Sequence, residues 1–291
     1  MGDSTPETET LLVPISSEET ADRQLETAID LARDRSYRIR LLYVLEVPPQ
    51  LSLQDGRRYL LEDETERLLE ESAERVAAAG VPVDQRIRLA RDVGAGILGG
   101  AEEYEVDAIL MGWRGRPPRE QVILGGYLDT VLRSAPCDVL VKRIKTPTPD
   151  IDSILVCVAG GPHDEYAAET AGSIARRHDA SVTLLHVHDP AEPEPGRDEG
   201  AALLARTERH LEGVDPVDRR LVEADDVAGT LTDWSADHDV TFLGTSRGGL
   251  LERQLLGTVS EAVGRHAAGT VVLAKRHEPV PSRLRRLFRR D

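Results

Sequence analysis

Short apolar runs alternate with amphipathic stretches along the first half of the chain. The runs are four to nine residues long and suit buried strands, whereas the longer stretches between them repeat their apolar residues at helical spacing. Strands are predicted at residues 11–15, 39–44, 81–89, 108–111 and 138–141, and helices at 17–32, 58–79, 93–105 and from Gly125. This βα alternation predicts an α/β fold with a doubly wound parallel sheet and helices on both faces.

The second half repeats the same order of apolar runs. Its strands are predicted at residues 154–158, 182–187, 240–243 and 270–273. Gly112 and Gly244 stand 132 positions apart, as do Gly125 and Gly257. A repeat of this length indicates two copies of one domain rather than a solenoid. We therefore predict a first copy at residues 10–145 and a second copy at 151–276, each with a five-stranded sheet. A disordered N-terminus at 1–9, a linker at 146–150 and a basic tail at 277–291 complete the organisation.

A glycine-rich loop follows the fourth predicted strand of each copy. The first loop places Gly112, Gly115, Gly125 and Gly126 in the spacing Gly-x2-Gly-x9-Gly-Gly. The second has Gly244, Arg247, Gly257 and Thr258 at the matching places. Glycines let backbone N–H groups approach an anion, and a helix N-terminus adds a positive dipole end. The pattern predicts a phosphate loop in each copy.

These paired loops resemble the signature of the universal stress protein family, Gly-x2-Gly-x9-Gly-(Ser/Thr), over nearly the whole chain. The resemblance implies a Rossmann-like fold of the adenine nucleotide alpha hydrolase type. It also implies that the fifth strands, at 138–142 and 270–274, join the copies as a pseudo-dimer, and that the chain can form a homodimer. The implied role is a regulatory stress-response module in the cytoplasm, not an enzyme, with ATP (with Mg²⁺) or AMP as ligand.

The resemblance also assigns site residues. Members of the family that bind ATP use an Asp at the end of strand one, where this chain has Ser16 and Ala159. Backbone at the end of strand two, Val44 and Val187 here, contacts adenine. The phosphates fall to the loops, where Gly126 replaces a hydroxyl residue and Arg247 replaces a glycine.

Each site therefore departs from the pattern in a different way. One hypothesis is retained nucleotide binding, with the first copy the better site because glycine rather than Arg247 lines its phosphate path. The alternative is a nucleotide-independent interaction module that docks on a membrane transporter or regulatory protein. In that case the loop glycines serve only the turn from strand to helix. Slow ATP hydrolysis is a third and weaker reading.

Two other motifs point to chemistry that we consider less well supported. Residues 244–248 match the Gly-x-Ser-x-Gly turn of hydrolases, but the first copy has Trp113 and Arg114 at the matching place. His186 and His188 lie on one strand face, yet no cysteine or second histidine pair accompanies them. Strand histidines are therefore favoured over a metal site.

Composition adds information on the environment. The net charge is −16, there are three lysines, and Asn is absent. Such a surface suits a cytosol at high salt and favours a halophilic archaeal source over an acidic bacterial protein with biased codons. It argues against nucleic acid as a partner. Cys137 and Cys157, within or beside apolar runs, are expected to be buried thiols. No run is long enough to span a membrane, and the N-terminus does not resemble a signal peptide.

The C-terminal tail is basic in an acidic chain. Residues 283–290 include Leu284, Leu287 and Phe288 at helical spacing among arginines. The stretch could contact an anionic membrane, but a solvated tail, or one folded on the acidic surface of the protein, is favoured because high salt weakens such contacts.

We expect stability to rise with salt. At a net charge of −16, self-repulsion weakens as the Debye length falls from about 10 Å at 0.1 M to about 3 Å at 1 M. Thermal unfolding followed by circular dichroism in increasing KCl should give a rising Tm. A Tm that stays flat or falls between low and molar KCl would contradict the halophilic interpretation.

Overall fold

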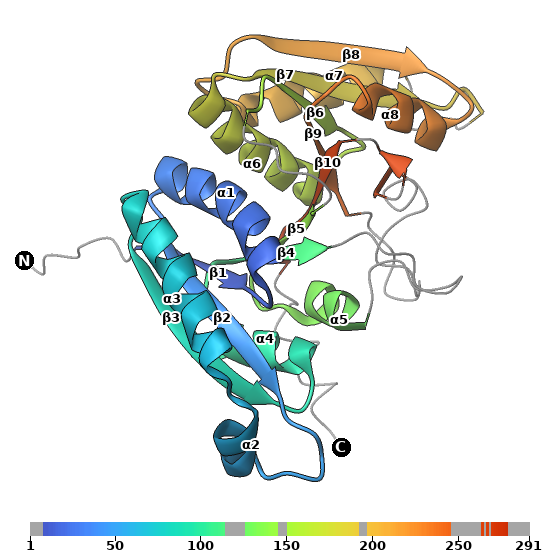
Figure 1. Ribbon diagram of the computed structural model, residues 1–291. Coiled ribbons are helices and arrows are strands. Elements are labelled where there is room, and N and C mark those ends of the chain that lie inside the picture. The colour runs from blue at the N-terminus through green and yellow to red at the C-terminus, as the bar shows by residue number, and fades with distance from the viewer. Residues whose placement is uncertain are drawn as a thin grey trace, which may run out of the picture.

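The computed structural model describes residues 8–113, 126–144, 150–191, 197–245, 263–264, 266–267 and 269–278 (Figure 1). The strands of both copies form one ten-stranded sheet in the order β3-β2-β1-β4-β5-β10-β9-β6-β7-β8. The predicted α/β class and the repeat are therefore confirmed. The predicted linker and most of the basic tail lie outside the described residues, and the exact domain limits stay predictions.

The first copy contains five strands and five helices among its described residues. They are β1 (Thr10–Pro14), α1 (Glu18–Arg35), β2 (Arg38–Glu46), α2 (Leu53–Leu60), α3 (Asp63–Ala78), β3 (Val83–Ala90), α4 (Val93–Glu103), β4 (Ala108–Trp113), α5 (Gly126–Ser134) and β5 (Asp138–Arg143).

The second copy repeats this order. Its described elements are β6 (Ser153–Cys157), α6 (Pro162–His178), β7 (Ser181–His188), α7 (Arg197–Thr207), a 3₁₀ turn (Glu208–His210), β8 (Val217–Glu223), α8 (Val227–Ser235), β9 (Val240–Gly244) and β10 (Thr270–Lys275).

The single helix predicted at 58–79 is wrong, because two helices occupy this region. The chain is extended at Leu61 and Glu62 between α2 and α3. Acidic residues crowd the first turn of α3 and Arg57 and Arg58 lie in the last turn of α2, so each helix has charges that suit its dipole. The helical periodicity continues through the break between the two segments. The sequence pattern therefore predicted one helix.

The two fifth strands, β5 and β10, join the copies. They pair antiparallel, with Val141 opposite Leu273 and Val139 opposite Lys275, whereas the other pairs of neighbouring strands are parallel. Pairing covers two apolar edges that would otherwise invite association with other chains. The predicted pseudo-dimer is therefore confirmed within one chain.

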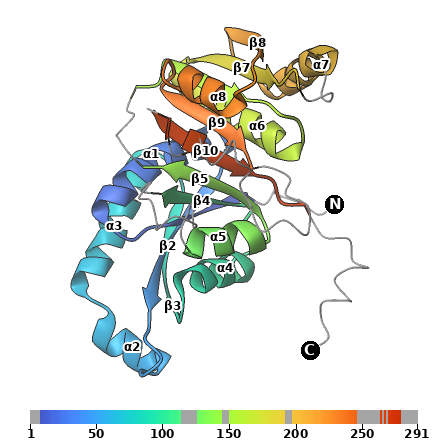
Figure 2. The same ribbon diagram turned by 90° about the vertical axis from the view of Figure 1, so that its right-hand side faces the viewer.

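Helices cover both faces of this sheet (Figures 1 and 2). α1, α3, α6 and α7 pack on one face, where Leu25, Tyr166 and Phe242 are fully buried. α4, α5 and α8 cover the other face, around Leu128, Val131 and Leu231. Among the described helices, none is both long enough and apolar enough to cross a membrane.

The two copies also meet through α1 and α6, which lie side by side in the middle of the molecule (Figure 1). Arg176 on α6 donates two hydrogen bonds to Asp34 on α1, at 2.9 and 2.6 Å. Burial would raise the pKa of Asp34, but the bonds from Arg176 and Ser173 outweigh it and hold that pKa below its ordinary value. His178 contacts Asp30 at 3.0 Å. The joint between the copies thus combines a paired sheet with polar helix contacts.

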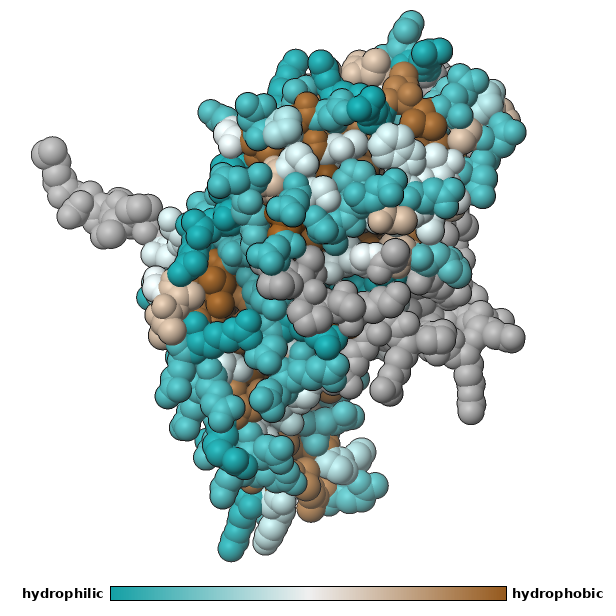
Figure 3. All heavy atoms as spheres, turned by 45° about the horizontal axis from the view of Figure 1, so that its top comes forward, coloured by the Kyte–Doolittle hydropathy of each residue, from teal (hydrophilic) through white to brown (hydrophobic). Residues whose placement is uncertain are grey.

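The surface is hydrophilic over most of the face drawn in Figure 3, with only scattered apolar side chains. Both cysteines are free and buried, as expected. Burial raises the pKa of the Cys137 thiol to about 12, so it stays protonated and unreactive near neutral pH.

Candidate functional site

The strand order of the first copy reverses between β1 and β4. In open α/β sheets such a reversal opens a crevice beyond the carboxyl ends of the two strands. β1 pairs with β2 only as far as Pro14 and Leu42, and Ile15 donates its N–H to the Leu42 carbonyl at 2.9 Å. β2 continues to Glu46, so it does not end at Val44 as predicted. Because backbone groups alternate along a strand, Val44 faces the same side as Leu42, where β1 has already ended. Its amide and carbonyl therefore face the crevice at which ligands bind in open α/β sheets.

Ser16 and Gly112 flank this crevice. Ser16 is exposed, directly beyond the end of β1. Gly112 lies within β4 and pairs with Lys142, so the expectation that it begins a loop is wrong. A Cβ on Gly112 would overlap Ile144 Cδ1 and lie 3.0 Å from Gln24 Oε1. Close packing thus accounts for this glycine without a ligand.

Gln24 bridges β1 and β4 beside this switch point. Gln24 is 1% exposed, and its side chain donates hydrogen bonds to the carbonyls of Pro14, at the end of β1, and of Leu110, within β4. A neutral amide therefore holds the switch point of the first copy together, through backbone acceptors.

Gly126 differs from Gly112 because it has space around it. It is the first residue of α5, and a Cβ built on it meets no described atom within 4 Å. The N-terminal N–H groups of a helix of this length are suited to an anion. Gly115 and Gly125, the other predicted phosphate contacts of this copy, lie outside the described residues.

The second copy has the same arrangement of strands. Val158 donates its N–H to the Leu185 carbonyl at 2.8 Å, so Val187 faces the crevice between β6 and β9 as Val44 does between β1 and β4. Gly244 ends β9, and a Cβ on it would overlap Asp164 Oδ1 and lie 2.8 Å from the Asp164 backbone nitrogen. Arg247, Gly257 and Thr258 lie outside the described residues.

Asp164 is the residue at this site that sequence reasoning missed. Its carboxylate is buried in the first turn of α6 and accepts hydrogen bonds from the backbone amides of Ala159 and Gly160, at 2.7 and 2.6 Å, and from that of Gly244. Burial raises the pKa of Asp164 above its ordinary value, although these amide bonds oppose the shift. The available signal was a Gly-Gly-Pro turn with an acid in the third helical position, which ordinarily indicates no more than a helix cap.

His186 behaves as a strand histidine. It is buried on β7, and its Nδ1 lies 2.7 Å from the Val158 carbonyl. That acceptor fixes the proton on Nδ1. Among the described residues, no group of three or more His, Cys, Asp or Glu side chains is arranged to hold a metal ion.

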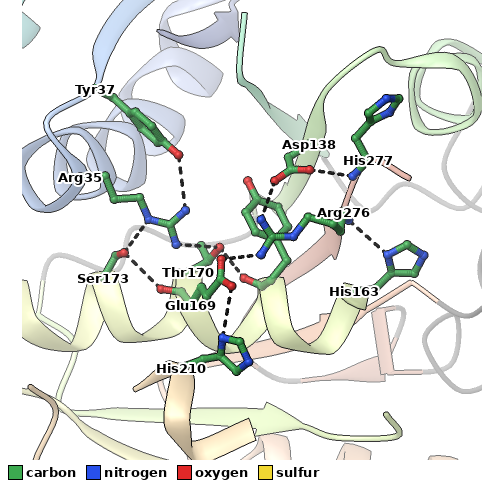
Figure 4. Close-up of polar contacts among 11 residues, drawn as sticks. Arg35, Tyr37, Asp138, His163, Glu169, Thr170, Ser173, His210, Arg276 and His277 are labelled. Carbon is green, nitrogen blue, oxygen red and sulfur yellow. Dashed lines mark hydrogen bonds and ion pairs between the residues drawn. The ribbon is translucent and has the colours of Figure 1, made fainter. Parts of the chain in front are cut away.

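A polar cavity of about 670 Å³ lies between the copies (Figure 4). Arg276 lies 4.6 Å from the ring centroid of Tyr166 and contacts Glu169 at 2.5 Å and Asp138 at 3.2 Å. Arg35 donates to the Ser173 hydroxyl at 2.8 Å. Burial raises the pKa of Asp138, although bonds from the His277 amide and Arg276 oppose this. The charged side chains that line this cavity largely pair with one another. They therefore suit a contact between the copies better than a ligand site.

Comparison with known proteins decides the family. The model of the universal stress protein family matches residues 7–143 and again residues 151–275. The chain belongs to the universal stress protein family. The double match agrees with the two copies seen in the fold.

Individual relatives agree with this assignment. The chain is 27% identical to universal stress protein Rv2624c of Mycobacterium tuberculosis over 281 residues, which cover 94% of this chain and 99% of that protein. It is 26% identical to the Na(+)/H(+) antiporter NhaS5 of Synechocystis sp. over 269 residues, 91% of this chain. The match spans 38% of that antiporter's length, and only 62% of another relative, universal stress protein Rv2005c of M. tuberculosis.

A solved structure shows the same fold. The universal stress protein from Archaeoglobus fulgidus DSM 4304 superposes with a TM-score of 0.69 at 19% identity, covering 92% of this chain and 97% of that chain. The shared architecture therefore extends over both copies of this universal stress protein.

Proposed function

We propose that this universal stress protein is a regulatory, non-catalytic protein of the cytoplasm that binds ATP or AMP in the crevice of its first copy. The observation that carries the proposal is the extension of β2 beyond β1, which turns the backbone of Val44 toward the crevice. That is the place where the family resemblance puts adenine. Ser16 is exposed just beyond the end of β1, and Gly126 begins α5, where an added Cβ meets no described atom within 4 Å.

The remaining parts of this proposal follow the resemblance. Gly112, Gly115, Gly125 and Gly126 would supply the path of the phosphates, with Mg²⁺ accompanying ATP. In the second copy the corresponding set is Val187, Gly244, Arg247, Gly257 and Thr258. The same fold would allow a homodimer of whole chains.

Substitutions at Gly126 test nucleotide binding without disturbing the core. Gly126→Ser restores the hydroxyl donor of the family pattern and should tighten ATP binding by about 1 kcal/mol, a few-fold in Kd. Gly126→Asp places a carboxylate where the phosphates are expected and should weaken or abolish binding. A Cβ at position 126 meets no described atom within 4 Å, and Ser and Asp suit a helix N-terminus, so both variants should fold.

The measurement is calorimetric titration of ATP in molar KCl with Mg²⁺, with adenosine as a phosphate-free control. Adenosine should bind the two variants with the same affinity, because it carries no phosphate. If the Gly126→Ser and Gly126→Asp variants bind ATP with equal affinity, the phosphates do not lie at the start of α5.

A second candidate function is a nucleotide-independent module that docks on a membrane transporter. The similarity to an Na(+)/H(+) antiporter over nearly this whole chain favours it, as do Ser16 and Ala159 at the places of the family's Asp. No heat of binding for the wild type or for either Gly126 variant would leave this candidate as the better supported one.

A further inference from the structure

The switch point of the second copy is already occupied by a negative charge of the chain itself. Asp164 is 7% exposed, and its carboxylate binds the backbone amides of Ala159, Gly160 and Gly244, which we call the amide cradle. Two of these amides follow the end of β6 and the third ends β9, so the cradle spans the crevice between the two strands. Backbone amides converging on one anion form the kind of site that phosphate groups use.

The local backbone is shaped around this carboxylate. Gly160 and Gly161 have φ angles of 100° and 116°, which residues with a side chain rarely adopt. Gly244 has no Cβ, and one placed there would overlap the Asp164 carboxylate. An ordinary cap such as Asp226 accepts instead from an amide of its own helix, that of Gly229 at 2.8 Å. Asp164 reaches upstream of its helix and across to another strand, which capping does not require.

The first copy lacks this arrangement. The left-handed C-caps of α1 and α6, Ser36 and Asp179, set the register between the two helices. In that register Ala21 stands where Asp164 stands in the second copy. In the first copy Gln24 bridges the two strands instead. It donates to carbonyl groups and does not occupy the backbone amides.

We propose that Asp164 is a built-in occupant of the amide cradle that closes the second copy to phosphate, so that the chain takes nucleotide in its first copy alone. A phosphate entering the second crevice would find the amides already bonded and would lie against a buried carboxylate. Residue 164 thereby determines how many nucleotides the chain holds. This inference rests on the proposed function, because it concerns the same kind of site and ligand.

The test compares ATP stoichiometry in the full-length wild type, Asp164→Ser and the control Asp226→Ser. Asp226 is the N-cap of α8 in the same copy, and its carboxylate accepts from an amide of its own helix, that of Gly229. Calorimetry in molar KCl with Mg²⁺ should give one more ATP per chain for Asp164→Ser than for the wild type, and no change for Asp226→Ser. Equal stoichiometry in the wild type and Asp164→Ser, at any value, overturns the proposal.

The outcomes separate this inference from the proposed function. No ATP in the wild type but one in Asp164→Ser would reject binding in the first copy and support closure of the second. One ATP per chain in both proteins would support binding in the first copy and reject closure of the second.

If Asp164→Ser does not unfold cooperatively, Asp164→Asn takes its place, because it keeps the shape and one acceptor oxygen but not the charge. Pyrophosphate should then raise the Tm of Asp164→Asn by more than that of the wild type. Equal shifts would overturn the proposal.

Discussion

Replacing Leu273 with proline is expected to destabilise the whole chain by about 3 kcal/mol or more beyond the loss caused by Leu273→Ala. The carbonyl of Ala274 accepts a hydrogen bond from the N–H of Thr245 on the β9 side. Because backbone groups alternate along a strand, the N–H of Leu273 points toward β5. Proline removes that bond in the middle of the sheet, whereas Leu273→Ala accounts for the lost side chain. If the copies separated in solution, this N–H would face water and proline would be tolerated.

The matched control is proline at an edge of the same sheet. The N–H of Ala224 donates to the His188 carbonyl on β7. Arg219 on β8 lies an odd number of residues before Ala224, so its N–H points the opposite way, away from β7. Arg219→Pro should therefore cost about 1 kcal/mol or less. Urea unfolding followed by circular dichroism measures each free energy. Similar losses for Leu273→Pro and Arg219→Pro would contradict a paired β5 and β10.

Gly244→Ala is expected to be far more damaging than Gly126→Ala, with a loss of about 3 kcal/mol. The added Cβ would lie 2.8 Å from the backbone nitrogen of Asp164 and 2.9 Å from the backbone carbon of His163. Backbone at the start of α6 cannot move aside as a flexible side chain can. The same methyl would also push the Asp164 carboxylate out of the amide cradle.

Gly126→Ala serves as the control for that substitution. Its Cβ meets no described atom within 4 Å, and Gly126 lies within α5, so alanine fits its helical backbone. It should be neutral or stabilising by up to about 1 kcal/mol, since alanine favours the helix. Thermal and urea unfolding of both variants give the comparison. A Gly244→Ala protein as stable as Gly126→Ala would show that the close contact with α6 is absent in solution.

The sequence by itself determined the repeat and the fold class, and the family resemblance that it carries implied the pairing of the two fifth strands. Apolar runs such as 139–141 and 271–273 have the length and spacing of buried parallel strands, and the βα order leaves few topologies for them. An apolar edge must also be covered, and each copy offers the other a matching edge. These properties depend on periodicity and burial, which local residue patterns record directly.

Only the tertiary structure decided what individual site residues do. The sequence pattern placed Val44 at a strand end and Gly112 in a loop, but β3 holds β2 in register to Glu46 and β5 keeps Gly112 within β4. Asp164 resembles an ordinary helix-capping acid in sequence. Its carboxylate meets the amide of Gly244, 80 positions further along the chain, only because β6 and β9 lie side by side. Such contacts depend on the strand order of the folded sheet, and no local periodicity encodes which distant backbone group a side chain will reach.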